Sequence, residues 1–98
     1  MNAGEWTFLS NYGHVLVALA QAPDARMRDV ATAVGITERA VQQIVRELVT
    51  QGYVEKEKVG RRNRYRVVRS AHFRHEMEAD VSLGAFLDLV IGRRTSAK

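Results

Sequence analysis

Apolar side chains recur at helical spacing near the start of the chain. The first stripe consists of Val15, Ala18, Leu19 and Ala22. Residues three and four positions apart share one face of a helix, so this stripe predicts a helix over residues 12–22 with one buried face. Ser10 or Asn11 can cap the N-terminus of that helix, and Pro23 ends it.

Two further helices are predicted on either side of Gly35, a residue that suits the left-handed turn at a helix end. The shorter helix covers residues 28–34, and the longer helix covers residues 37–51 with Thr37 as its cap. Their buried stripes are Val30, Ala31 and Val34 in the shorter helix, and Val41, Ile44, Val45, Leu48 and Val49 in the longer one. The longer helix has a polar opposite face, which is free to meet a partner.

A β-hairpin is predicted after the third helix, with strands over residues 54–59 and 64–68. If Val59 pairs with Arg64, Glu57 lies opposite Arg66 as a cross-strand ion pair. Period-two alternation then turns one set of side chains to a common face, namely Val54, Tyr65 and Val67. Residues 25–27 are expected to form a short strand that joins this hairpin.

The two ends of the chain are expected to lie outside this unit. Residues 1–11 form an N-terminal arm, residues 12–69 form the central domain, and residues 70–98 form a linker and a last helix. Ser82 caps that helix. Its apolar stripe is Leu83, Phe86, Leu87 and Val90, with Arg93 and Arg94 near its negative end and residues 95–98 frayed.

The charge distribution changes the picture more than the composition does. The chain has 98 residues, a net charge of +4 and a pI near 10.0, which allow one small, moderately basic domain. Eight lysines and arginines and only two glutamates fall within residues 54–74, whereas residues 75–91 hold four acids and no lysine or arginine. A basic hairpin beside a helix with a free polar face favours contact with DNA.

Other function classes find little support in the residues. The chain has no cysteine, so disulfides and thiolate metal sites are excluded. His72 and His75 are three residues apart with Glu76 and Glu78 nearby, but solvated linker histidines explain them better than a metal or pH-sensing site. No catalytic arrangement stands out, so we expect no enzyme activity, no cofactor and no bound metal. No signal peptide or membrane-spanning stretch is visible, and the cytoplasm is the expected location.

The order of these elements resembles the winged helix-turn-helix of small bacterial regulators of the MarR- and ArsR-like groups. The resemblance covers residues 12–68. Its marks are Ala31, Gly35, Ile36, Val41, Leu48, the run Gly52-Tyr53-Val54 and the basic wing tip. It implies a mainly α fold with a small hairpin wing, in the order α-α-α-β-β followed by a C-terminal helix. The chain lacks the long flanking helices of full MarR proteins and the cysteines of metal-sensing ArsR-like ones.

The resemblance implies that residues 37–51 enter the major groove of double-stranded DNA and that the wing, residues 58–64, lies along the backbone or minor groove. The expected contacts from the recognition helix are Thr37, Glu38, Arg39, Gln42, Gln43 and Arg46. The expected contacts from the wing and backbone-binding positions are Arg28, Lys58, Arg61, Arg62, Asn63 and Arg64. Among these, Arg39 suits guanine, and Gln42 or Gln43 suits adenine.

A single copy with about four phosphate contacts binds weakly, so the hypothesis includes a homodimer on a two-fold symmetric site with half-sites about 34 Å apart. The expected dimer contacts are Trp6, Phe8, Leu83, Phe86, Leu87, Val90 and Ile91. Two alternatives stay open, namely a winged-helix module for protein contact and an architectural DNA- or RNA-binding protein without sequence preference. The sequence does not identify a small-molecule effector.

Overall fold

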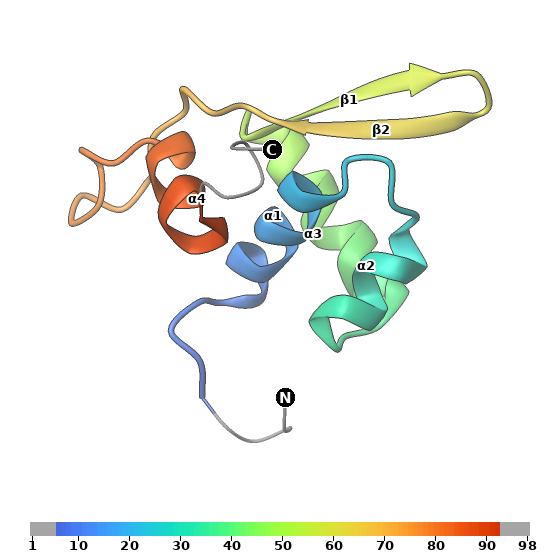
Figure 1. Cartoon of the computed structure of the whole chain (residues 1–98), viewed down its shortest axis with the longest axis horizontal. Helices are drawn as coiled ribbons and strands as arrows, with labels where there is room; N and C mark the ends of the chain where they lie inside the picture. The colour runs from blue at the N-terminus through green and yellow to red at the C-terminus, as the bar shows by residue number, and fades with distance from the viewer. Residues whose placement is uncertain (1–5, 93–98) are drawn as a thin grey trace.

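Four helices and one two-stranded antiparallel hairpin make up the computed structural model, which describes residues 6–92. The elements are α1 (Asn11–Gln21), α2 (Met27–Val34), α3 (Glu38–Thr50), β1 (Val54–Val59), β2 (Arg62–Val67) and α4 (Leu83–Ile91). Figure 1 shows the hairpin extending from the helical body, with the N-terminal arm leaving on the other side. The predicted fold class, mainly α with a hairpin wing, is confirmed.

The helices begin and end where small polar residues and glycine allow it. The hydroxyl oxygens of Ser10, Thr37 and Ser82 accept hydrogen bonds from backbone N–H groups in the first turns of α1, α3 and α4, at 3.4, 3.0 and 3.1 Å. Each cap satisfies a donor that the helix leaves unpaired. Gly35 ends α2 with a φ of 89°, a conformation that a side chain would strain.

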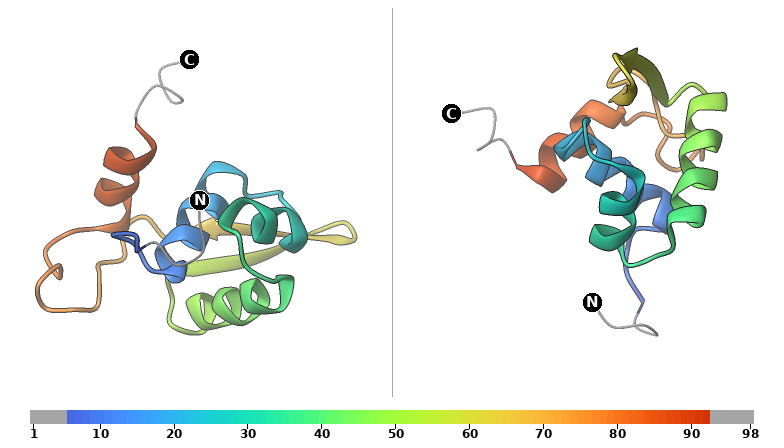
Figure 2. Two further views of the ribbon diagram at one scale, coloured as in Figure 1. Left: turned by 90° about the horizontal axis from the view of Figure 1, so that it is seen from below. Right: turned by 90° about the vertical axis from the view of Figure 1, so that its right-hand side faces the viewer.

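The core forms around α1, which contacts α2, α3, α4 and β2. Val15 and Leu19 of α1 and Val41 of α3 have no exposed surface. Figure 2 shows α1 between α4 on one side and α2 and α3 on the other, with the hairpin running alongside. Leu16 belongs to the buried stripe of α1, but Ala22, which was predicted there, is exposed because the helix ends at Gln21. The remaining core side chains are Val30, Ala31, Ile44, Val45, Leu48, Val54, Tyr65, Val67, Leu83 and Leu87.

The hairpin register differs from the prediction by two residues. Val59 pairs with Arg62, so the turn contains only two residues, Gly60 and Arg61. Gly60 has a φ of 62°, as the first loop position of a type II′ turn requires. In this register Glu55, and not Glu57, lies opposite Arg66 and pairs with it. Because a shift by two residues preserves the face, the prediction that Val54, Tyr65 and Val67 share one face is confirmed, and these three side chains are buried.

The expected short strand over residues 25–27 is wrong. Met27 is the first residue of α2, and the hairpin is a two-stranded sheet within the described part of the chain. One backbone hydrogen bond nevertheless joins the two segments, since the N–H of Tyr65 donates to the carbonyl of Pro23 at 3.2 Å. The loop between α1 and α2 therefore covers β2 without extending the sheet.

Residues 70–81 form an irregular loop that connects the hairpin to α4 and leads the chain back to the core. His72 and Ser82 make an isolated bridge, and the N–H of Leu83 donates to the carbonyl of Ala71 at 2.7 Å. The rings of Phe73 and Phe86 meet edge to face with centroids 5.2 Å apart. Residues 1–5 of the predicted arm, the charges of Arg93 and Arg94, and the fraying of residues 95–98 lie outside the described residues.

Because α4 packs on α1, two leucines on the same helix are expected to differ in how much they contribute to the stability of the fold. Leu87 is 1% exposed and Leu89 is 85% exposed. We expect Leu87→Ala to lower the free energy of unfolding by about 2–5 kcal/mol, because it leaves a cavity. Leu89→Ala is the matched control and is expected to change it by less than about 0.5 kcal/mol. Urea denaturation at a protein concentration low enough to keep the chain monomeric measures both, because dimerisation would add to the apparent stability. Equal effects would show that α4 is not part of the core.

Candidate nucleic-acid interface

The outward face of α3 is fixed by its buried face. Val41, Ile44, Val45 and Leu48 turn toward the core, and the residues on the opposite side of the helix are polar. All the predicted contact residues of this helix are exposed, namely Thr37, Glu38, Arg39, Gln42, Gln43 and Arg46. By helical periodicity Arg39 and Arg46 lie directly opposite the core, with Gln42 and Gln43 on either side of them. This face carries arginine side chains, which donate hydrogen bonds, and glutamine side chains, which both donate and accept them. Base edges present partners of both kinds.

Thr37 and Glu38 shape the start of α3 as well as its surface. The Thr37 hydroxyl accepts from the N–H of Ala40 at 3.0 Å, so its oxygen already has a structural partner. Glu38 lies in the first turn, where a negative side chain stabilises the positive end of the helix dipole. Both residues keep exposed surface at the end of the helix that faces outward.

The hairpin carries the predicted wing residues in exposed positions. Lys58, Arg61, Arg62, Asn63 and Arg64 are all exposed around the tip of the hairpin. Two of them are attached to the helical body. A guanidinium N–H of Arg62 donates to the carbonyl of Asp24 at 2.5 Å, and Nε of Arg64 lies 3.4 Å from a carboxylate oxygen of Asp24. Arg28 is exposed in the first turn of α2.

A groove of about 350 Å³ separates α3 from the hairpin. Gln42 and Arg46 border it from α3, and Lys56 and Asn63 border it from the strands. Its remaining walls are Met27, Val45, Val49, Thr50 and Tyr65. The polar sides of helix and wing therefore face one shared space. Lys56 was missed in the sequence analysis, although it shares a face of β1 with Val54 by simple alternation.

A sequence model described as the MarR family matches residues 9–64. The match includes α1, α2, α3 and β1 and reaches into β2, so it covers the complete helix-turn-helix and the wing tip. The chain belongs to the MarR family. The search of curated proteins returned no match.

Membership of the MarR family indicates DNA-binding transcription regulation. MarR regulators are generally non-enzymatic DNA-binding proteins. Within residues 6–92, no three His, Asp or Glu side chains lie close enough to hold a metal ion. The two linker histidines bond to backbone, His72 through Nδ1 to the carbonyl of Ala79 at 2.7 Å and His75 through Nδ1 to the N–H of Met77 at 3.0 Å.

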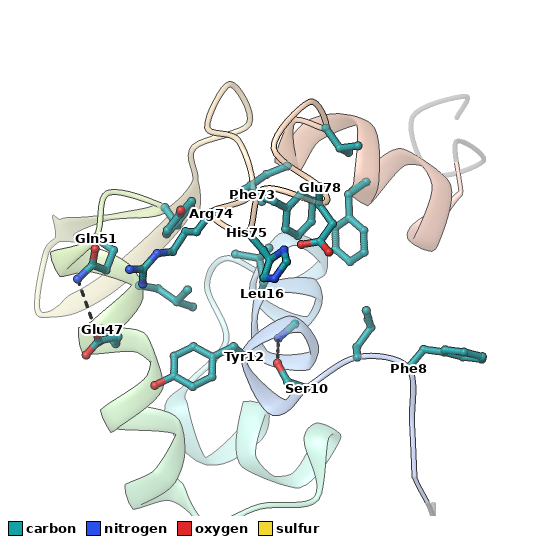
Figure 3. Close-up of a pocket in the computed structure, with 17 residues that line it drawn as sticks. Phe8, Ser10, Tyr12, Leu16, Glu47, Gln51, Phe73, Arg74, His75 and Glu78 are labelled. Atoms are coloured by element: carbon teal, nitrogen blue, oxygen red, sulfur yellow. Dashed lines mark hydrogen bonds between the residues drawn. The ribbon is translucent and has the colours of Figure 1, made fainter.

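A larger cavity of about 860 Å³ in this MarR-family chain is lined by none of the predicted DNA-contact residues. It lies among the arm, the start of α1, the end of α3, the loop over residues 73–81 and α4. Figure 3 shows Tyr12, Leu16 and His75 bordering this space, with Phe8 at its outer edge. Its walls are mostly apolar, and the charged side chains at its rim are Glu47, Arg74 and Glu78.

The structure divides the residues that were predicted to form a dimer interface. Leu83 and Leu87 are 2% and 1% exposed in the core of their own chain, so they are not available to a partner. Phe86 and Ile91 are partly buried against the same core, whereas Val90 is 47% exposed. Trp6 and Phe8 are largely exposed and stack edge to face on each other. Leu89, which was missed, is the most exposed apolar side chain of α4.

None of the described helices has the length and apolar composition needed to cross a membrane.

Proposed function

We propose that this MarR-family chain is a sequence-specific regulator that binds double-stranded DNA as a homodimer on a two-fold symmetric operator. The observation that supports this most directly is the shared groove between the polar face of α3 and the wing, bordered by Gln42, Arg46, Lys56 and Asn63. The recognition helix lies in the major groove, and the wing lies along the backbone or minor groove. The protein works in the cytoplasm, on the nucleoid when it is bound to DNA.

Base readout falls to the first two turns of α3, because residues near the start of a recognition helix reach deepest into the groove. Arg39 bonds O6 and N7 of a guanine, and Gln42 or Gln43 bonds N6 and N7 of an adenine. Thr37 and Glu38 lie at the same end and limit which bases fit beside them. In support, Arg39 is exposed, lies opposite the core and makes no ion pair within the described residues.

Phosphate contacts come from cations that surround this readout surface. These are Arg28 on α2, Arg46 on α3, Lys56 in the groove and cations at the tip of the wing. Each phosphate that a protomer neutralises changes the slope of log K against log salt by about −0.9. Contacts from one protomer give weak binding at physiological salt, and a second protomer doubles their number.

The dimer forms through the exposed apolar residues at the end of the molecule away from the wing. The arm provides Trp6 and Phe8, and α4 provides Leu89 and Val90, which are 85% and 47% exposed. Phe86 and Ile91 support this surface from below. Exposed aromatic and aliphatic side chains of this kind are typical of protein interfaces. Figure 1 shows the wing and the N-terminal arm on different sides of the helical body, so both are accessible at once.

Selection from random duplex DNA at near-physiological salt tests the proposed readout. We expect a motif with two-fold symmetry and half-sites about 34 Å apart. Arg39→Ala is expected to relax one position in each half-site and to cost about 1–3 kcal/mol on the selected site. Arg74→Ala is the matched control, because it removes the same charge at the rim of the larger cavity. Recovery of no motif, with weak binding that vanishes as salt rises, would instead identify a non-specific DNA- or RNA-binding protein.

The proposed dimer surface can be tested by substitutions that lie outside the predicted DNA contacts. The double variant Phe8→Ser with Leu89→Ser is expected to weaken dimerisation at least about tenfold, since loss of central apolar contacts costs more than about 1.4 kcal/mol. Met77→Ser is the control, because Met77 is also largely exposed but lies on the 70–81 loop. Sedimentation equilibrium measures the association constant. A double variant that dimerises as tightly as the wild-type chain excludes this surface.

A further inference from the structure

Five arginines lie within or just after the hairpin, namely Arg61, Arg62, Arg64, Arg66 and Arg69, and four of them have partners within the chain. Arg66 pairs with Glu55 on β1, and Arg69 pairs with Asp88 on α4 at 2.8 Å. Arg62 and Arg64 both bond to Asp24. Among the described residues, Arg61 at the tip of the turn makes no hydrogen bond or ion pair with its side chain, and the same holds for Lys58. Most of the arginines in and beside the wing are therefore already engaged within the chain, and only Arg61 among them has a side chain without such a partner in the described residues.

Asp24 contacts the wing at two atoms. Its backbone carbonyl accepts from a guanidinium N–H of Arg62, and its carboxylate lies 3.4 Å from Nε of Arg64. Arg62 and Arg64 are two residues apart on β2, so their side chains leave the strand on the same face. One loop residue thus holds two neighbouring cations of the same strand.

The backbone beside Asp24 strengthens this attachment. The N–H of Tyr65, the residue directly after Arg64, donates to the carbonyl of Pro23 at 3.2 Å. The Tyr65 side chain is buried in the core at 8% exposure. The loop between α1 and α2 therefore contacts β2 at Arg62, Arg64 and Tyr65. These contacts also protect that edge of the hairpin from pairing with another chain.

We propose that Asp24 is a positioning residue that determines which wing cations reach DNA. It holds Arg62 and Arg64 against the helical body, where they fix the angle between the wing and α3. Lys58 and Arg61 are then the wing cations that neutralise phosphates. This inference rests on the proposed DNA-binding function and narrows the set of wing contacts given above.

The consequence for recognition is a limit on non-specific affinity. Phosphate contacts contribute equally to every sequence, so additional free arginines raise binding to all DNA. A carboxylate that forms an ion pair with one wing arginine lowers the affinity for non-specific DNA, and it does so without contacting the bases. The ratio of specific to non-specific affinity, and not the affinity itself, is what a regulator needs among many competing sites.

The test is the salt dependence of binding to one fixed duplex, measured for a set of charge variants of the full chain. Asp24→Asn keeps the carbonyl that binds Arg62 but removes the charge that holds Arg64. We expect it to make the slope of log K against log salt more negative by about 0.9 per protomer, because one more arginine reaches a phosphate. Arg64→Gln alone is expected to leave the wild-type slope unchanged, and in the Asp24→Asn background it is expected to restore that slope.

Glu57→Gln is the matched control for charge. Glu57 lies directly opposite Arg64 in the hairpin but makes no ion pair within the described residues. The variant removes the same charge close to the wing and releases no arginine, so it is expected to raise affinity without changing the slope. If Arg64→Gln in the wild-type background makes the slope less negative by about 0.9, Arg64 already contacts a phosphate and the proposal is wrong.

Two readouts separate failure of this proposal from failure of the proposed function. Arg61→Gln is expected to make the slope less negative by about 0.9. If the chain does not bind duplex DNA, or Arg61→Gln has no effect, the function assigned to the wing is wrong. Hydrogen exchange of the Tyr65 amide, measured without DNA, reports on the attachment alone. It is expected to be faster in Asp24→Asn and unchanged in Glu57→Gln, and equal exchange in all three proteins would contradict the positioning role.

Discussion

The burial of one face of α3 is the constraint on which the rest of the structure depends. This helix has a single apolar stripe, and Val41 within it has no exposed surface. Because that stripe packs against α1 and α2, helical periodicity places Arg39, Gln43 and Arg46 on the opposite, exposed side of the helix. The readout surface is therefore a consequence of core packing.

The wing is the second part of the surface, and its position depends on contacts at both of its ends. Tyr65 and Val67 anchor its base in the core, and the loop at Pro23 and Asp24 holds its outer edge. A hairpin of two strands is only marginally stable by itself in water. These attachments hold the hairpin beside α3, across the groove bordered by Gln42, Arg46, Lys56 and Asn63. In the proposed function, helix and wing contact one duplex together from the two sides of this groove.

Much of this fold follows from local signals in the sequence. Ser10, Thr37, Ser82 and Gly35 mark helix ends because each meets a local backbone requirement that neighbouring residues cannot change. The inward face of the hairpin was also predictable, since it depends only on alternation. The register was not, because it depends on whether the turn holds two residues or four, and the sequence from Gly60 to Asn63 permits both.

The errors concern partners that are distant along the chain. An apolar stripe such as that of α4 shows that a face is buried, but not which surface covers it. Leu83 and Leu87 were therefore assigned to a partner subunit, and the structure places them on the chain's own core. The contact between Arg62 and Asp24 joins residues 38 positions apart, and charge counting alone treated all the wing arginines as free. Contacts between residues this far apart produce no periodic pattern in the sequence, so they could not be predicted from it.

The most direct test of the central claim is to map the amide chemical shifts of the isotope-labelled chain on titration with duplex DNA at moderate salt. We predict that the largest changes fall on residues 37–46 of α3, on the wing over residues 58–64 and around Arg28, and that α4 and the loop over residues 70–81 change little. Changes concentrated around the larger cavity, or none along α3, would contradict the assignment of this face to DNA.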